Sequence, residues 1–393
     1  MDIVSEVKKR EKELIKFRRE FHKMPEIGLE TPETAKFIKK ILEENNIEYE
    51  NYINNNGVVA VIDSGKEGKC LGIRTDMDAL EIKEETDLPF KSTNGYMHAC
   101  GHDSHMAGVL ITLLILNDNK YKFRGKVKFI FQPGEEYPGG AELMIKEGVL
   151  ENPRVDAIVA LHAGGIFPEV PKGKIGVKNG KLMASMDKFH IEVLGQGGHG
   201  STPEDTIDPI PVLCDIVQGI NKIKSREIPL NEHVTISVCK IQAGFNQNII
   251  PSNGEIEGTV RTYNDEIRSY IRDRIGEIVK SYTLGNRCDY KFFYSWKYPY
   301  LENNEEITEK LRNSVKKVLG EEDLYEIESM SMAGEDMSYY LREIPGTFFT
   351  LSNLQEDKDG KTYPNHNSKF DLDENLLWKG VAVFIQFALD FLN

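Results

Sequence analysis

The spacing of apolar residues changes twice along the chain. Up to about residue 180, stretches with helical spacing alternate with short apolar runs, and the clearest of these runs are 69–75, 126–132 and 157–162. Such runs are typical of strands that are buried on both faces of a parallel sheet. This first stretch therefore predicts an α/β domain in which helices flank a mostly parallel sheet.

After Met183, apolar and polar residues alternate with a period of two, as at Phe189, Ile191 and Val193. This period predicts strands that have one solvated face. We expect strands near 188–196, 233–242, 254–262 and 288–295, and helices near 207–224 and 265–281. The resulting order, β-α-β-β-α-β, predicts a separate ferredoxin-like α+β domain.

From about residue 297 the helical spacing returns, with one more apolar strand at 346–351 and a closing helix at 375–392. The simplest organisation joins the two ends of the chain into one large domain and inserts the middle segment. We therefore expect residues 1–184 and 297–393 to form the large domain, and residues 185–296 to form the inserted small domain.

Composition and charge exclude several classes of protein. The 49 Lys and Arg residues against 63 Asp and Glu give a net charge of −14, which disfavours binding to nucleic acid. The first 23 residues lack the apolar core of a signal peptide, and no window approaches the ~20 consecutive apolar residues of a membrane span. Five cysteines without regular spacing indicate a reducing compartment. We therefore expect a cytoplasmic protein with no nucleic-acid or membrane partner.

Residues that can bind metals or move protons follow the ends of the predicted strands. Asp76 and Asp78 follow the first run, Glu135 and Glu136 follow the second, and His162 ends the third. Functional groups collect at the carboxyl edge of a parallel sheet. We therefore expect these side chains to lie close together.

Cys100 and His102 stand just before a predicted helix, for which Asp103 or Ser104 is the expected N-terminal cap. The pair is too close in sequence to share a helix face, so we expect a turn that brings the two side chains together. Thiolate and imidazole suit zinc and similar ions, and carboxylates suit harder ions. A metal hydrolase is therefore the leading hypothesis.

Each of these residues also has an ordinary interpretation when it is taken alone. A Cys-x-His pair is commonly a buried thiol beside solvated histidines, and an acidic pair such as Glu135-Glu136 is commonly an exposed loop. His162 would serve equally as a hydrogen-bonded core histidine, and His366 lies in a polar loop. Only the convergence of these side chains would make them a site.

Seven motifs are spread over almost the whole chain: RREFHKMPEIGLE (18–30), GIRTDMDAL (72–80), MHACGHDSHMAG (97–108), FIFQPGEEYPGGAELMIKEGVL (129–150), LGQGGHGSTPE (194–204), NIIPSNGEIEGTVRT (248–262) and AGEDM (333–337). Together they resemble the dinuclear metallopeptidase superfamily of aminoacylases. The branch that looks most similar contains amidohydrolases, including hippurate hydrolases, auxin-conjugate hydrolases and N-acetyldiaminopimelate deacetylases. The combination of ACGHD, GEE, LH and a late histidine is far more specific than any single motif.

The resemblance implies the inserted-domain architecture and a pair of divalent cations, with zinc or manganese expected first and cobalt or nickel also tolerated. The implied metal ligands are Cys100, His102, Glu136, His162 and His366. Glu135 would be the general base, and Asp76 and Asp78 would have supporting roles, with Asp78 orienting a neighbouring group.

The resemblance also assigns residues of the small domain. His199 matches a histidine that reaches the substrate carbonyl, and Asn248 and Arg261 match positions that touch the substrate. The planar guanidinium of Arg261 suits a free carboxylate. Relatives often dimerise through this domain, which suggests a homodimer.

The expected reaction is hydrolysis of the amide bond of a small N-acyl amino acid, of N-acetyl, N-benzoyl or indoleacetyl type. Two cations would lower the pKa of a water molecule and hold the developing oxyanion. Glu135 would carry the proton to the leaving nitrogen, and His199 would complete the oxyanion clamp.

Three alternatives stay open. The first is a dipeptidase or carboxypeptidase with the same cations, and the second is a thiol hydrolase in which Cys100 attacks with His102 or His105 as its base. The third is a binding module that keeps the fold without the reaction. Two departures from the family pattern, at 163–167 and at Glu204, leave the acyl group unassigned.

Overall fold

The computed structural model describes all residues 1–393 and divides the chain into two compact units. The large unit consists of Met1–Leu182, Glu302–Ser331 and Asp336–Asn393, and the small unit consists of Met183–Leu301 with Met332–Glu335. The small domain was expected at 185–296. The short return at 332–335 was not expected, because four residues are too few to show a period. One contact of this segment is the hydrogen bond from the Ala184 N–H to the Ala333 carbonyl.

An eight-stranded sheet in the order β1-β2-β4-β3-β5-β16-β6-β15 forms the centre of the large unit. Strands β4, β3, β5 and β16 pair in parallel, and β1, β2 and the β16–β6 pair are antiparallel. The prediction of a mostly parallel sheet is therefore confirmed. The strands are β1 (Tyr49–Tyr52), β2 (Gly57–Asp63), β3 (Cys70–Asp76), β4 (Lys126–Gln132), β5 (Ala157–Gly164), β6 (Ile175–Val177), β15 (Leu324–Glu326) and β16 (Gly346–Ser352).

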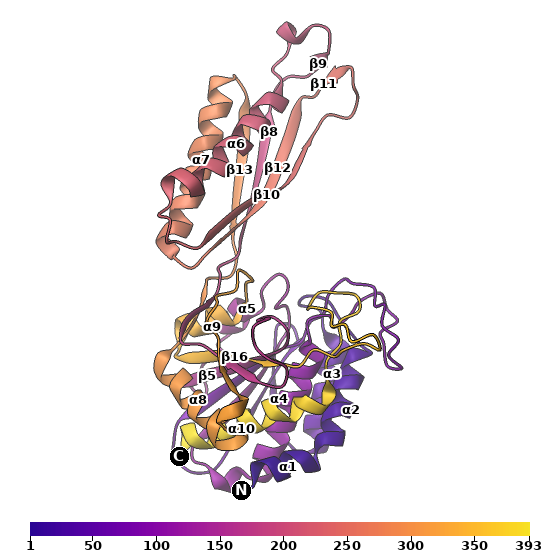
Figure 1. The fold of residues 1–393 in the computed structure, drawn as a ribbon, viewed down its shortest axis with the longest axis vertical. Helices are drawn as coiled ribbons and strands as arrows, with labels where there is room; N and C mark the ends of the chain where they lie inside the picture. The colour runs from indigo at the N-terminus through magenta and orange to yellow at the C-terminus, as the bar shows by residue number, and fades with distance from the viewer. The chain divides into compact units, whose positions relative to one another are not determined.

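Helices flank this sheet, and the most deeply buried of them is α4, which packs against α2, α10 and β3 (Figure 1). Its residues from His102 to Leu116 are all buried, as expected of a helix with apolar residues around its whole circumference. The helices of the large unit are α1 (Ile3–Lys9), α2 (Glu11–His22), α3 (Pro32–Glu44), α4 (His102–Asp118), α5 (Ala141–Lys146), α8 (Glu305–Leu319), α9 (Met337–Glu343) and α10 (Leu377–Leu392).

The closing helix is apolar enough to resemble a membrane span. By length and composition alone, the segment Glu374–Leu392 could cross a bilayer, but 67% of this window is buried inside the protein. Its side chains Val381, Phe384 and Phe387 belong to the main hydrophobic core. The segment is therefore accounted for as a core helix.

The start of α4 differs from the prediction. Neither Asp103 nor Ser104 caps this helix: its N-cap is Gly101, which has a left-handed backbone with a φ of 91°. This conformation is accessible to glycine without steric cost. Asp103 lies inside the first turn instead, where its carboxylate accepts hydrogen bonds from Arg18 and His22.

The small unit contains a four-stranded antiparallel sheet in the order β10-β12-β8-β13, with two helices packed against it (Figure 1). This is the ferredoxin-like order, and every predicted element lies within four residues of its observed bounds. The elements are β8 (Asp187–Leu194), α6 (Pro209–Glu227), β10 (Val234–Ala243), β12 (Asn253–Thr262), α7 (Asp265–Gly285) and β13 (Asp289–Trp296).

Several short elements were not predicted, since two to four residues are too few to show a period. The most relevant is the antiparallel pair of β9 (Gly198–His199) and β11 (Ile249–Ile250) in the small unit. The others are the pair of β7 (Gly180–Met183) and β14 (Leu301–Asn303), and the 3-10 helices η1 (Lys120–Lys122), η2 (Pro203–Asp205), η3 (Glu321–Asp323) and η4 (Glu374–Leu376).

Candidate metal centre

His102, the first residue of α4, has one ring nitrogen held by the backbone and one that is free. Its Nδ1 lies 2.8 Å from the carbonyl oxygen of Asp78. A carbonyl can only accept, so Nδ1 carries the proton and Nε2 presents a lone pair. This Nε2 is buried and has no hydrogen-bond partner. Burial lowers the pKa of His102, which favours the neutral imidazole that binds metals.

His162, near the end of β5, also has one ring nitrogen bound to a backbone carbonyl and the other facing the donor cluster. Its Nδ1 donates to the carbonyl oxygen of Ala163 at 2.7 Å, and its Nε2 lies 3.4 Å from the Sγ of Cys100. Burial, followed by the neighbouring His105, holds the pKa of His162 well below its usual value. The imidazole is therefore a neutral donor that faces the thiol.

Glu135 and Glu136 follow β4, and Asp78 positions the backbone that carries them. The two carboxylate oxygens of Asp78 accept hydrogen bonds from the backbone N–H groups of Glu135 at 2.8 Å and Glu136 at 3.0 Å. Burial, together with the charge of Glu136, raises the pKa of Asp78 well above its usual value despite these bonds. Donor atoms of Glu135, Glu136 and His102 lie within 4.8 Å of one another.

His366 reaches the other donors from a loop, through backbone contacts that the sequence does not reveal. Its N–H donates to the carbonyl of Ala99 at 2.7 Å, and its φ is 68°, in the left-handed region. Its Nε2 lies 3.3 Å from the Sγ of Cys100 and 3.0 Å from the Oε1 of Glu136. The hydrogen bond to Glu136 raises the pKa of His366.

The neighbouring Asn365 clamps this loop onto the strand end. Its Oδ1 accepts from the N–H of Gly165 at 3.0 Å, and its Nδ2 donates to the carbonyl of Cys100 at 3.2 Å. A Cβ atom on Gly164 would lie 2.8 Å from the side chain of Asn365. The glycines after His162, which lie where the chain departs from the family pattern, therefore allow the loop to approach closely.

The structure brings all five predicted ligands together. Cys100, His102 and His162 form one group of donor atoms within 4.8 Å, and Cys100, Glu136 and His366 form a second group. Two groups that share one thiol match a pair of neighbouring cations, and the mixture of sulfur, nitrogen and oxygen donors suits zinc, manganese and similar ions.

The pKa of the Cys100 thiol tests the alternative in which this residue is the nucleophile of a thiol hydrolase. Burial, and then the charges of Glu136 and Glu135, raise the pKa of this thiol well above its usual value. A catalytic thiol needs a lowered pKa, because the thiolate is the nucleophile. A bound cation would favour the thiolate instead, so Cys100 has the surroundings of a metal ligand.

The candidate residues of the small unit fall into two places. His199 lies opposite Ile249 in the β9–β11 pair, and the N–H of Gly200 donates to the carbonyl of Asn248 at 2.9 Å. These strands adjoin the end of β12 that begins at Asn253 (Figure 1). The imidazole of His199 is exposed and contacts the Oγ of Ser201 at 2.7 Å.

Arg261 lies near the other end of β12, where it pairs with Thr235. It comes eight residues after Asn253, a separation of roughly 27 Å along a strand. Its Nη1 is buried without a hydrogen-bond partner, and burial lowers the pKa of its guanidinium. One small substrate therefore cannot contact both Arg261 and His199 of the same small unit.

A buried polar network beneath α4 was not predicted. Arg18 donates to Asp103 at 2.9 Å, and His22 contacts Asp103 at 2.8 Å and Glu84 at 3.2 Å. Burial by itself would lower the pKa of His22, but the bonds to Asp103 and Glu84 outweigh it and raise this pKa to about 9. The motif at 18–30 contained a signal for this network. Arg18 and His22 recur on the same face of α2 as the apolar residues Phe17 and Phe21, so their charged groups are buried with that face.

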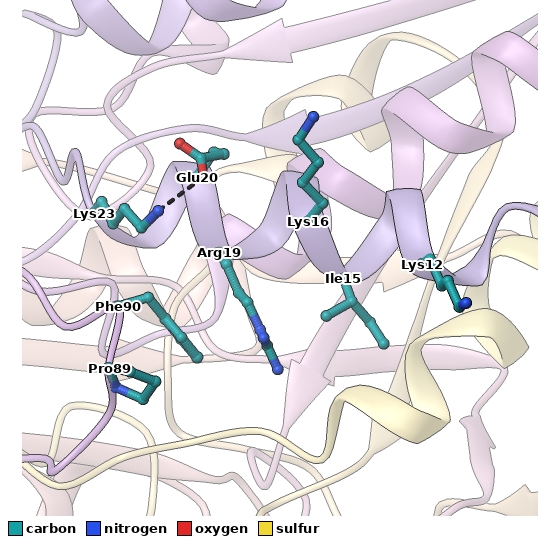
Figure 2. A pocket seen from close by; sticks show the side chains of 8 residues that line it. All are labelled: Lys12, Ile15, Lys16, Arg19, Glu20, Lys23, Pro89 and Phe90. Carbon is teal, nitrogen blue, oxygen red and sulfur yellow. Dashed lines mark hydrogen bonds and ion pairs between the residues drawn. The ribbon is translucent and has the colours of Figure 1, made fainter.

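A separate pocket of about 330 Å³ lies along α2 and contains none of the candidate residues (Figure 2). Lys12, Lys16, Arg19 and Lys23 project from the helix around it, and Phe90 lies across from Arg19. Glu20 pairs with Lys23 at 2.8 Å. The pocket holds no grouped metal donors, so the donor cluster remains the candidate site.

A mostly parallel sheet whose carboxyl edge gathers a thiol, imidazoles and carboxylates defines a metal-dependent hydrolase. The family model described as Peptidase family M20/M25/M40 matches residues 72–390. The chain belongs to this family.

Similar proteins agree with this assignment. The thermostable carboxypeptidase 1 of Saccharolobus solfataricus is 37% identical over 406 residues, which cover 100% of both chains. The N-acetylcysteine deacetylase of Bacillus subtilis is 36% identical over 96% of both chains. The solved structure of the Bacillus subtilis YXEP protein, described as a dinuclear metal binding peptidase from the M20 family, is 33% identical with a TM-score of 0.82, and the match covers 98% of this chain and 99% of that one.

Proposed function

We propose that this enzyme hydrolyses the amide bond of small N-acyl amino acids. The observation that carries the proposal is the meeting of five donors in two groups that share Cys100, with Glu135 directly beside them. The ligands would be Cys100, His102, Glu136, His162 and His366, and zinc or manganese fits this set best. The deacetylase among the relatives supports an acylated amino acid as the substrate.

Divalent cations held by these residues would polarise the amide carbonyl and lower the pKa of a water molecule. Glu135 is 6% exposed and is held by Asp78 through its backbone N–H. It takes the proton of the attacking water and returns it to the leaving nitrogen, a role worth about 10²–10⁴-fold in rate.

Arg261 is the candidate for the free carboxylate of the substrate. Its unpartnered, buried Nη1 is costly unless a ligand pairs with it. A carboxylate accepts two parallel hydrogen bonds from a guanidinium, which gives both affinity and orientation.

His199 and Asn248 would serve a different copy of the chain from the one whose Arg261 holds the substrate. The separation of roughly 27 Å along β12 supports this arrangement, because a substrate bound by Arg261 is far from His199 of the same small unit. The predicted homodimer would supply the second copy. Mixing His199→Ala protein with Arg261→Ala protein should then give more activity than either variant alone, because a mixed dimer has one site in which both residues are intact.

A carboxypeptidase is the second candidate, since a relative that covers the full chain at 37% identity has that name. The two functions use the same donors and the same carboxylate contact. They differ in the acyl side of the scissile bond, where one enzyme accepts a simple acyl group and the other accepts a peptide.

A substrate panel tests the proposal. Turnover is measured for N-acetyl, N-benzoyl and indoleacetyl amino acids, for free dipeptides and for N-blocked dipeptides, with released amino acid as the readout. We expect the highest kcat/KM for an N-acyl amino acid. A clear preference for dipeptides or N-blocked dipeptides would contradict the proposal and favour a peptidase.

A further inference from the structure

Two buried side chains beside the donor cluster are neither candidate metal ligands nor the proposed general base. Asp76 ends β3 and His105 lies in the first turns of α4, with exposed fractions of 1% and 3%. The Nδ1 of His105 lies 2.7 Å from the Oδ1 of Asp76, and its Nε2 lies 2.7 Å from the backbone nitrogen of Ala163. Both ring nitrogens are occupied, so His105 has no lone pair to offer a cation.

These contacts decide which nitrogen of His105 carries the proton. A backbone N–H can only donate, so Nε2 is unprotonated and accepts from Ala163. The ring proton of the neutral imidazole is therefore on Nδ1 and is donated to Asp76. Asp76 is held in turn by the Nη1 of Arg74 at 3.1 Å, and Arg74 is fixed by Asp336 at 2.5 Å.

Ala163 connects this pair to a candidate ligand. Its N–H is held by His105, and its carbonyl oxygen accepts the Nδ1 proton of His162 at 2.7 Å. The strand is held on its other side by Thr350, whose Oγ1 donates to the carbonyl of His162 at 2.9 Å. With Nδ1 so engaged, the Nε2 of His162 points at Cys100, 3.4 Å away.

We propose that Asp76 and His105 are positioning residues that act through Ala163 to set the tautomer and orientation of His162. Histidine ligands commonly donate their second ring nitrogen to a carbonyl or carboxylate, and such partners influence metal affinity. Here a carboxylate and a second imidazole hold the residue that supplies the carbonyl. The proposal rests on the proposed function in that it takes His162 as a ligand.

Two substitutions of His105 separate its two contacts. In His105→Gln the amide oxygen can take the place of Nε2 and accept from Ala163. In His105→Asn the amide nitrogen can take the place of Nδ1 and donate to Asp76, which leaves the N–H of Ala163 without an acceptor. The pair is matched in polarity and hydrogen-bonding groups.

The test is titration of the full-length apoprotein with Co²⁺ alone, followed by the visible absorption of the bound ion. We expect His105→Asn to weaken the binding of one Co²⁺ ion by about 10- to 100-fold. His105→Gln should bind like the unchanged protein. Unchanged affinity in the Asn variant, or an equal loss in both variants, would overturn the proposal.

If the His105→Asn protein does not fold, the Asp76→Asn variant provides a second test of the proposal. This variant keeps the imidazole but removes the charge that favours its Nδ1 proton, and we expect it to weaken Co²⁺ binding as well. An Asp76→Asn protein that folds and binds both ions with unchanged affinity would exclude the role of Asp76.

Glu135→Gln separates this inference from the proposed function. It should lose turnover and keep its Co²⁺ affinity. If it keeps turnover, the proposed general base is wrong, and the titrations of the His105 variants still decide the positioning role on their own.

Discussion

The donor cluster of the large unit and the proposed substrate-binding residues of the small unit are held in different ways. In the cluster, His102 and His162 each have one nitrogen fixed by a backbone carbonyl, and the Glu135–Glu136 backbone is fixed by Asp78. In the small unit, the exposed imidazole of His199 is hydrogen-bonded to its neighbour Ser201, and Arg261 keeps a buried nitrogen without a partner.

This difference indicates a division of labour. Catalytic geometry must be held within fractions of an ångström, so it benefits from partners that fix each donor before the substrate arrives. Recognition benefits from groups whose hydrogen bonds are completed only by the correct ligand, because a wrong ligand leaves them unpaired. The two units can therefore be perturbed separately.

The largest effect is expected from removing metal. Chelation with EDTA should abolish essentially all turnover, and added zinc or manganese should restore it, because the donor cluster without cations has no means of polarising an amide. Metal analysis of the active protein gives the ion and the stoichiometry. Turnover that survives chelation and is lost with iodoacetamide would instead support a thiol mechanism.

Glu135→Gln tests the chemistry of the large unit alone. We expect kcat to fall by about 10²–10⁴-fold, since the amide cannot accept the water proton. The metal content should be unchanged, because Glu135 is a base and not a ligand. Loss of bound metal in this variant would mean that Glu135 belongs to the ligand set.

Arg261→Ala tests recognition by the small unit. We expect KM to rise by roughly 10- to 100-fold with a smaller change in kcat, as for the loss of a charge-assisted hydrogen bond worth about 1.5–3 kcal/mol. The KM of Arg261→Lys should be intermediate, because lysine keeps the positive charge but cannot make the two parallel hydrogen bonds of a guanidinium. A matched substrate whose carboxylate is replaced by an amide should show no difference between Arg261→Ala and the unchanged protein.

The smallest expected effect is a change in the free energy of unfolding of the large unit with pH. The folded pKa of His22, about 9, lies above its unfolded value of about 6.5, so its contribution is complete below pH 6.5 and is lost as the pH rises through 9. Between pH 7 and 8.5 the large unit should lose roughly 2 kcal/mol, and His22→Gln should remove this dependence.

The two tryptophans report the units separately, since Trp296 lies in the small unit and Trp378 in α10 of the large unit. Urea unfolding of a Trp296→Phe variant follows the large unit, and that of a Trp378→Phe variant follows the small unit. An equal loss of stability in both units over this pH range would contradict the assignment to His22.

The small unit was the easier part of the fold to predict. Its strands and helices were expected within a few residues because each has one buried and one solvated face, and this leaves a period in the sequence. The β9–β11 pair and the return at 332–335 leave no period. They depend on contacts with residues far away in the chain.

In the large unit, the apolar runs that form β3, β4, β5 and β16 and the polar residues that follow the first three were already visible in the sequence. Asp78, Glu135 and His162 could be placed at one edge because parallel strands bring their carboxyl ends together. The five candidate ligands followed from the motifs by resemblance, and the structure brings their donor atoms together.

The sequence by itself therefore determined the longer strands and helices of the small unit, the mostly parallel sheet of the large unit and the kinds of donor atom, because these depend on local periodicity and residue chemistry. Only the tertiary structure decided that Gly101 caps α4, that Asn365 brings the His366 loop onto the strand end, and that Ala163 links His105 to His162. These features depend on backbone angles and on hydrogen bonds between residues distant in sequence, which no local pattern encodes.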